Sequence, residues 1–301
     1  MASPIIVLAG GTGDLGGRIA RALVERGATV RALVRPNASA GATAVLVATG
    51  VTVVPVEPGD EPGIATACTD AKCVVSALNG LRDVIIDRQE VLLDAAVRAK
   101  VPRFIPSDFS LDFTKTDPGG NRNLDLRREF LERAARAPIK LTSILNGAFM
   151  DMLGAEMPII QSKLRRVLYW ESADQPLDFT TKDNVAAFTA AAALERDTPR
   201  ILRIAGDTVS ARELAATMSE VTGKRYGTLW AGNLTMLGLM IAAGKRLAPA
   251  PTAVFPPWQG MQYTRDMFSG RGKLAPLDSA RYPGIAWTRV REHLTHRFAR
   301  A

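Results

Sequence analysis

The chain has 301 residues, of which 47% are hydrophobic and 23% charged, and its formal net charge is +8. A chain of this length can bury a large core, which excludes a disordered protein and a small disulfide-stapled domain. Two cysteines and two histidines cannot supply an ordinary closed zinc site, so we expect no metal. Cys68 and Cys73 are expected to act as small buried hydrophobic residues.

The charge pattern and the apolar stretches bear on partners and location. The Arg127–Arg128 pair is flanked by Asp125 and Glu129, which is typical of a solvated surface and not of a nucleic-acid-binding face. Residues Met1–Ala9 lack the charged start of a signal peptide, and the longest apolar stretch, Leu229–Ala243, is short and interrupted. We therefore expect a cytoplasmic protein without a membrane span and without a nucleic-acid partner.

Strands and helices are expected to alternate in the first half of the chain. Six short segments rich in Val, Ile and Leu predict buried strands at Pro4–Ala9, Thr29–Val34, Val51–Val56, Cys73–Leu78, Arg103–Pro106 and Lys140–Leu145. Helical stretches lie between them at Asp14–Arg26, Ala42–Ala48, Glu61–Ala67, Val84–Ala99 and Leu124–Arg136. This alternation predicts an α/β fold, a Rossmann-type doubly wound parallel sheet, over residues 1–150.

The alternation weakens after Gly147. Short strands are predicted at Val167–Trp170, Leu177–Thr181 and Ile201–Ala205, and helices at Lys182–Leu194, from Ser210, at Leu234–Ala243 and from about Thr288. Glu213 lies three residues after Ser210, the spacing of a capping box. Residues 151–301 are therefore expected to form a smaller α/β lobe on the substrate side that is not an independent domain.

A glycine-rich turn directly follows the first predicted strand and leads into a helix. Its Gly-x-x-Gly-x-x-Gly spacing allows a tight turn, close approach of the backbone to a pyrophosphate, and close packing of helix on strand. The first N–H groups of the helix and its dipole attract the phosphates. The turn predicts a dinucleotide site made of Gly10, Gly11, Thr12, Gly13, Asp14, Leu15 and Gly16.

The residue after the second strand indicates which dinucleotide is bound. An NAD-selective site places Asp or Glu there to hold the ribose 2′-hydroxyl. This chain has Arg35, whose guanidinium can pair with a 2′-phosphate. We therefore expect NADP(H) in preference to NAD(H), with an ordinary surface arginine as the alternative for Arg35.

Two further segments fit the ends of parallel strands. Asp60 follows the third strand, where it either contacts the adenine ring or caps the next helix. The small-residue stretch after the fourth strand contains Ala77, Leu78 and Asn79, which let the backbone approach a ribose.

These segments resemble the NmrA-like and isoflavone-reductase-like group of atypical short-chain dehydrogenases. The matching motifs are Gly10–Gly16, Val34-Arg35-Pro36, Gln89, Val101–Phe109, Leu145–Phe149, Leu177–Ala186 and Ser210–Leu214. The group includes NADPH-dependent reductases of aromatic plant metabolites, quinone reductases and non-catalytic NADP-sensing regulators.

The resemblance implies which residues line the cofactor site and its pocket. Ser107, Asp108 and Phe109 are expected beside the nicotinamide, and Asn146, Gly147 and Phe149 are expected to border the pocket. Gln89 is expected among the cofactor-binding residues. Core packing is the alternative for the two phenylalanines, and a helix or loop cap is the alternative for Asp108.

The chain departs from the group at the residue expected to assist the reaction. The reductases carry a lysine on the helix after the Pro-Ser-Asp-Phe loop, whereas Arg127 and Arg128 stand nearest to that place here. Arginine stays protonated, so it can polarise a carbonyl but cannot exchange protons. The expected catalytic residues are thus Arg127, Arg128 and Asp108, and the proton donor is left open between Asp108, Tyr169, Tyr263 and a bound water.

Two functions fit these residues. One is an NADPH-dependent reductase of a small carbonyl, quinone or conjugated aromatic compound, since a hydride donor chiefly needs placement against its acceptor. The other is an NADP(H)-binding sensor of the NmrA type without turnover, because the family lysine is missing.

The expected partner is a small apolar or aromatic molecule, and the protein is expected to be a monomer or a homodimer. An apolar pocket or ordinary core is expected from Trp230, Met236, Phe255, Trp258, Met261, Tyr263 and Phe268.

Overall fold

The computed structural model describes residues 3–154 and 156–298 and divides the chain into two compact units. The first unit contains Met1–Phe109, Leu126–Ile144 and Val185–Leu202. The second contains Ser110–Asp125, Leu145–Asn184 and Arg203–Ala301. The chain passes between the units several times, which differs from the single boundary near residue 150 that the sequence suggested.

The first unit is built on a six-stranded parallel sheet with strand order β3-β2-β1-β4-β5-β6. The strands are β1 (Ile5–Ala9), β2 (Thr29–Val34), β3 (Thr52–Pro55), β4 (Ala71–Ser76), β5 (Arg103–Ile105) and β6 (Lys140–Leu141). Strand order reverses between β1 and β4, which gives the sheet two halves. The predicted doubly wound parallel sheet is confirmed.

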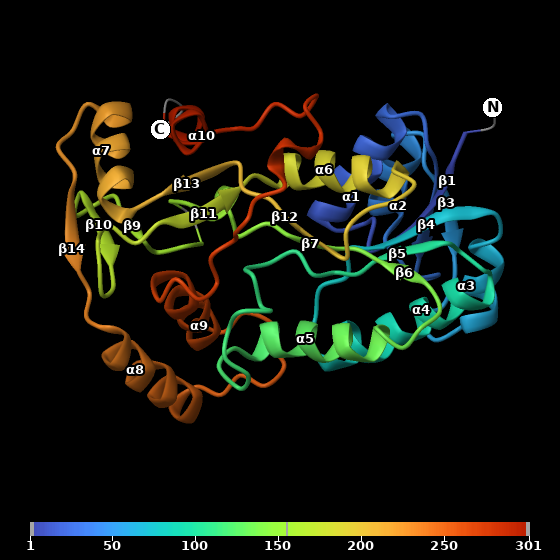
Figure 1. Ribbon diagram of the computed structural model, residues 1–301, viewed down its shortest axis with the longest axis horizontal. Helices are drawn as coiled ribbons and strands as arrows, with labels where there is room; N and C mark the ends of the chain where they lie inside the picture. Colours follow the sequence, from blue (N-terminus) through green and yellow to red (C-terminus); the bar gives the residue numbers. More distant parts are fainter. Residues whose placement is uncertain (1–2, 155, 299–301) are drawn as a thin grey trace. The chain divides into compact units, whose positions relative to one another are not determined.

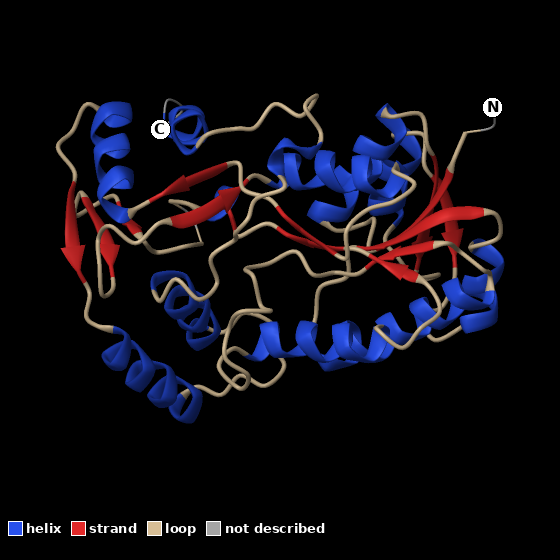
Figure 2. Cartoon of the chain, viewed as in Figure 1, coloured by secondary structure: helices blue, strands red, loops and turns tan. Residues whose placement is uncertain are grey.

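Helices cover both faces of this sheet (Figures 1 and 2). The helices are α1 (Asp14–Glu25), α2 (Ala40–Ala48), α3 (Glu61–Ala67), α4 (Gln89–Arg98), α5 (Arg122–Ala134) and α6 (Lys182–Leu194). Helices α1, α2 and α6 lie on one face, and α3, α4 and α5 on the other (Figure 1). Because both faces are covered, the central strand β1 is a continuous apolar run, and β4 is one from Cys73 to Val75.

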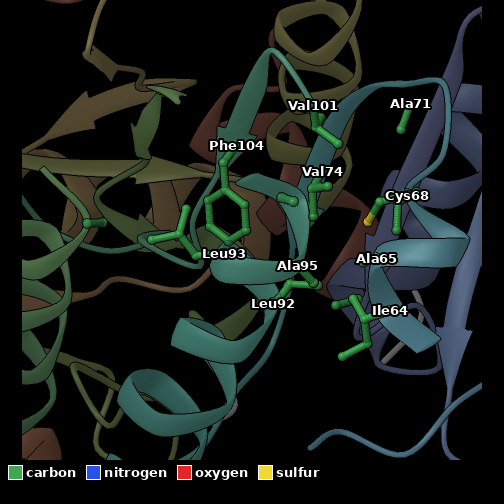
Figure 3. Close-up of a cluster of buried hydrophobic side chains, with 14 of the residues drawn as sticks. Ile64, Ala65, Cys68, Ala71, Val74, Leu92, Leu93, Ala95, Val101 and Phe104 are labelled. Atoms are coloured by element: carbon green, nitrogen blue, oxygen red, sulfur yellow. The ribbon is translucent and has the colours of Figure 1, made fainter. Parts of the chain in front are cut away.

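One core cluster joins the sheet to the helices α3, α4 and α5 (Figure 3). Phe104 of β5 and Val74 of β4 pack with Leu93 of α4 and Ile64 of α3 in this cluster. Cys68 is fully buried in the same cluster, and Cys73 is fully buried on β4. Burial raises the pKa of each thiol to about 12, so both cysteines are small apolar residues, as expected.

Two predicted elements of the first unit are interrupted. The predicted helix Val84–Ala99 begins instead as a π-helix, η1 (Asp83–Arg88), and continues as α4. The predicted strand Lys140–Leu145 divides at Thr142 into β6 and β7 (Ser143–Leu145). It divides because the backbone N–H of Thr142 still donates to Phe104 of the main sheet, whereas that of Ser143 donates to Arg200.

The second unit is a mixed structure with small sheets. Its strands are β8 (Ala148–Phe149), β9 (Ile160–Gln161), β10 (Arg166–Tyr169), β11 (Leu177–Thr180), β13 (Asp207–Val209) and β14 (Gly227–Trp230). They form the sheets β14-β10-β9 and β13-β11-β8, and β12 (Ile201–Arg203) pairs with β7.

The helices of the second unit include one α-helix and two short 3-10 helices that were not predicted from the sequence. They are η2 (Met150–Met152), α7 (Ala211–Thr222), α8 (Leu234–Leu247), α9 (Pro257–Phe268), η3 (Ser279–Arg281) and α10 (Val290–Phe298). The capping box of Ser210 and Glu213 at the start of α7 is confirmed. Helix α9 was not predicted, although its start at a proline, with Pro256 as N-cap, is a known helix signal. Among the described residues, no helix is long and apolar enough to cross a membrane.

Candidate functional site

The turn between β1 and α1 is tight at its base and open at its tip. Gly10 has φ +82°, and a Cβ on it would lie 2.5 Å from the carbonyl oxygen of Ala77. A Cβ on Gly16 would lie 2.1 Å from the carbonyl oxygen of Gly10. Both positions therefore require glycine for close packing.

The tip of the same turn presents backbone donors. Thr12, Gly13 and Asp14 are exposed, and α1 begins after Gly13, which has no side chain to cap the helix. The first N–H groups of an α-helix have no partner within the helix, and here no capping side chain takes them up. Such a turn presents backbone donors of the kind that bind the phosphates of a dinucleotide.

The two arginines of the β2 segment have different surroundings. Arg31 donates hydrogen bonds to the carbonyl oxygens of Ala67 and Thr69 at 2.9 and 2.7 Å. Arg35 follows β2 directly and is exposed, and among the described residues no hydrogen bond or ion pair holds its side chain. Arg35 is thus the arginine at this strand end that is available to an anionic ligand.

Asp60 takes the capping role that the sequence left as its alternative. Its Oδ1 accepts a hydrogen bond of 3.0 Å from the backbone N–H of Gly63, and Asp60 is the N-cap of α3. Helix capping therefore explains the position of the Asp60 side chain, and no ligand is needed to explain it. Contact with an adenine ring remains a prediction.

The loop after β4 lies against the glycine turn. Ala77 donates its backbone N–H to Ala9 at 2.9 Å, and its carbonyl oxygen faces the space above Gly10. Leu78 follows, and Asn79 is exposed. The loops after β1 and β4 therefore meet at the point where strand order reverses, which is where doubly wound sheets bind their ligands.

The loop after β5 is tied to the loop after β4. The hydroxyl of Ser107 donates to the carbonyl oxygen of Leu78 at 2.5 Å. Gln89 is fully buried and accepts the backbone N–H of Ser107 at 2.8 Å through its Oε1. Its Nε2 donates to the carbonyl oxygen of Ile85 at 3.0 Å. Gln89 therefore contacts the protein interior, a role that the sequence analysis did not foresee.

Asp108 is also inside the protein. Its side chain is fully buried, and its Oδ2 accepts a hydrogen bond of 2.7 Å from the hydroxyl of Ser143. Burial raises the pKa of this carboxyl to about 6, against the opposing effects of Ser143 and of the positive charges of Arg127 and Arg200. The carboxyl can thus carry a proton at mildly acidic pH, but the group is buried inside the protein.

The two arginines proposed to assist the reaction differ in burial. Arg127 is buried on α5 and close enough to Asp108 to influence its ionisation, whereas Arg128 is half-buried. Ser143 and Arg200 were not predicted from the sequence, because neither belongs to a motif and both come near Asp108 only through the fold.

Asn146 and Phe149 belong to the second unit. Asn146 is fully buried, its carbonyl oxygen accepts the hydroxyl of Thr180 at 2.7 Å, and its side-chain Oδ1 has no hydrogen-bond partner among the described residues. Gly147 has φ +68°, and a Cβ on it would lie 2.5 Å from the carbonyl oxygen of Asp178. Phe149 is half-buried on β8, whereas Phe109 of the first unit is buried.

The apolar side chains of the second unit divide into core and surface. Trp258 and Phe268 are buried in its core, while Trp230, Met236 and Phe255 are exposed. Tyr169, Met261 and Tyr263 are half-buried. In the described part of the chain, no cluster of three or more His, Cys, Asp or Glu side chains is arranged to hold a metal ion.

The sequence model of the NmrA-like family matches residues 2–229. The chain belongs to the NmrA-like family. Membership confirms the resemblance inferred from the glycine turn and the Pro-Ser-Asp-Phe loop.

Two curated plant proteins are similar in sequence to this NmrA-like chain. The isoflavone reductase homolog IRL of Zea mays is 28% identical over 243 residues, which cover 73% of this chain and 75% of that protein. Pinoresinol reductase 2 of Arabidopsis thaliana is 26% identical over 199 residues, 62% of this chain. The match spans 63% of the Arabidopsis protein, less than two thirds of its length.

Solved structures share the fold of this NmrA-like chain at low sequence identity. An isoflavone reductase has a TM-score of 0.81 at 19% identity, with 98% of this chain and 99% of that chain covered. An NADPH-dependent quinone oxidoreductase of Escherichia coli, solved with NADPH, has a TM-score of 0.77 at 19% identity, with 97% and 99% covered.

Proposed function

We propose that the protein is an NADPH-dependent reductase that transfers hydride to a small carbonyl, quinone or conjugated aromatic compound. The observation that carries the proposal is the turn from Gly10 to Gly16, whose open tip presents uncapped backbone donors at the start of α1. The names of the family's relatives, which are isoflavone, pinoresinol and quinone reductases, support the same reaction class.

The preference for NADPH rests on Arg35. This guanidinium is exposed after the end of β2 and has no hydrogen bond or ion pair among the described residues, while Arg31 on β2 is already bonded. A charge-assisted pair between Arg35 and a 2′-phosphate favours NADPH, and no carboxylate follows β2 to favour NADH.

The two halves of the sheet divide the cofactor between them. The adenosine half belongs over the ends of β1 and β2, beside the glycine turn and Arg35, and the nicotinamide half over the ends of β4 and β5. When bound, the reduced nicotinamide supplies the hydride. Ser107 and Leu78, which are bonded to each other, fix the loops on which that half rests.

Arg127 supplies a fixed positive charge at the reacting end. Its guanidinium is buried near the Pro106–Phe109 loop and stays protonated, so it stabilises negative charge that develops on an acceptor oxygen. It cannot deliver the proton that completes the reduction. Quinones suit such a site, because the hydroquinone anion formed by hydride transfer can take its proton from water.

The free cysteines and the exposed apolar side chains bear on the compartment and on the substrate. The two buried free thiols, Cys68 and Cys73, suit a reducing compartment such as the cytoplasm. Exposed apolar side chains of the second unit, such as Trp230 and Phe255, are the candidates for contact with an apolar or aromatic substrate. Either a monomer or a homodimer is compatible with these roles.

A turnover assay tests the proposal. Purified protein is mixed with NADPH and a panel of quinones, enones and aldehydes, and the absorbance of the reduced nicotinamide is followed. We expect NADPH consumption with at least one acceptor, quinones first. Tight NADPH binding without turnover on any acceptor would instead establish the second candidate, an NADP(H) sensor, which the arginine in place of the family lysine favours.

A further inference from the structure

Gln89 is a polar residue in the middle of an apolar helix face. It lies between Ile85 and Ile86 of η1 and Leu92 and Leu93 of α4, all of which are buried. The side chain of Gln89 is itself 0% exposed. A buried amide costs free energy unless its donor and acceptor are both bonded, so its contacts explain its presence.

Both ends of the Gln89 amide are bonded to backbone atoms. Nε2 donates to the carbonyl oxygen of Ile85 at 3.0 Å, within the π-helical turn that precedes α4. Oε1 accepts the backbone N–H of Ser107 at 2.8 Å. π-Helical turns are rare and occur often at functional sites. The side chain therefore bridges the junction of η1 and α4 to the loop after β5.

This bridge extends to the next strand end. Ser107, held through its N–H by Gln89, donates its hydroxyl to Leu78 in the loop after β4. Strands β4 and β5 are parallel neighbours, with Val74 opposite Phe104, so their loops leave the same edge of the sheet. The hydrogen bonds from Ser107 to Gln89 and to Leu78 thus fix the loops after β4 and β5 to each other.

We propose that Gln89 is a positioning residue for the nicotinamide half of the cofactor. The assignment rests on the proposed function, because it takes NADPH as the ligand of the first unit. Gln89 does not contact the cofactor; it holds the backbone of Ser107, and through it Leu78, in the position that the nicotinamide half requires. Arg35 and the exposed tip of the glycine turn lie on the other half of the sheet, and only the base of the turn packs on Ala77, so we expect binding of the adenosine half to depend little on Gln89.

The test substitutes Gln89→Met, which keeps the side-chain length and removes both hydrogen bonds. Titration calorimetry then compares NADPH with adenosine 2′,5′-bisphosphate, which carries the adenosine half and the 2′-phosphate but no nicotinamide. We expect the Kd for NADPH to rise about tenfold, while the Kd for the bisphosphate stays within about twofold of that of the wild-type protein.

Leu92→Ala is the matched control. Leu92 is buried on the same helix and its loss destabilises the fold, but it makes no hydrogen bond to the Ser107 loop. We expect Leu92→Ala to lower the Tm and leave the ratio of the two dissociation constants unchanged.

A measurement on the wild-type protein covers the case in which Gln89→Met does not fold. Hydrogen exchange at the amide of Ser107 should be slow without ligand, because its N–H is buried and bonded to Gln89. Fast exchange there, or equal losses of NADPH and bisphosphate affinity in Gln89→Met, overturns the assignment alone. Failure of the wild-type protein to bind either ligand overturns the proposed function, and the assignment with it.

Discussion

The two halves of the sheet present their strand ends differently. After β1 and β2 the functional groups face outward: Gly13 is exposed in an uncapped turn, and Arg35 is exposed. After β5 they face inward, because Ser107 and Asp108 are buried and hydrogen-bonded to the protein itself. Under the proposed function, the open half binds the charged end of the cofactor, and the other half is a fixed frame for the end that reacts.

The largest effect is expected from Gly13→Val, which fills the open half. A Cβ on Gly13 lies 3.3 Å from the carbonyl oxygen of Gly10, and the branched side chain beyond it occupies the space of the phosphates. We expect NADPH affinity to fall by about a hundredfold or more, measured by titration calorimetry, with little change in Tm. A large fall in Tm would show instead that Gly13 is required for folding. We expect such a fall for Gly16→Ala, because a Cβ there would lie 2.1 Å from the carbonyl oxygen of Gly10.

Arg35→Ala tests the same half with a smaller change. Loss of one charge-assisted contact to the 2′-phosphate should raise the Kd for NADPH about ten- to a hundredfold and leave the Kd for NADH unchanged. Arg21→Ala, on the exposed face of α1, is the control for a general loss of positive charge. Equal weakening of NADPH by both substitutions would contradict a specific role for Arg35.

Arg127→Ala addresses the inward-facing half. We expect kcat to fall about tenfold to a hundredfold while NADPH affinity is retained, because the proposed role of the guanidinium is to stabilise charge on the acceptor and not to hold the phosphates. Arg136→Ala, at an exposed position after α5, should leave kcat unchanged. If kcat is unchanged in Arg127→Ala and falls in Arg128→Ala, then the half-buried Arg128, and not Arg127, stabilises the charge on the acceptor.

Asp108 gives the inward-facing half a pH dependence of stability. Its folded pKa, about 6, lies above its ordinary value, so the folded state binds the proton more tightly than the unfolded state. Stability should therefore fall as the pH rises from about 4 to 6, by on the order of 2–3 kcal/mol relative to Asp108→Asn. Urea unfolding of both proteins across this range measures the difference, and parallel curves would place the carboxyl in a more polar setting.

The parts predicted from sequence are those set by local patterns. Buried parallel strands, the glycine turn and the capping box at Ser210 each depend on residues that are close in the chain, and the structure contains all three. Arg35 was placed correctly at the end of β2 because strand ends follow from the same patterns.

The parts that escaped prediction depend on contacts between distant segments. The division of Lys140–Leu145 reflects a change of pairing partner from Phe104 to Arg200, which no local pattern encodes. Gln89 follows a π-helical turn, and the buried Asp108 accepts a hydrogen bond from Ser143, which lies 35 residues further along the chain. Motif spacing predicted that the loop from Ser107 to Phe109 matters, but not that its polar groups bond to the protein.

The most direct test of the account is a calorimetric titration of the wild-type protein with NADPH and with NADH under the same conditions. The open turn and the exposed Arg35 predict that NADPH binds at least about tenfold more tightly, since only NADPH carries the 2′-phosphate. Tighter binding of NADH, or no binding of either nucleotide, would contradict the account.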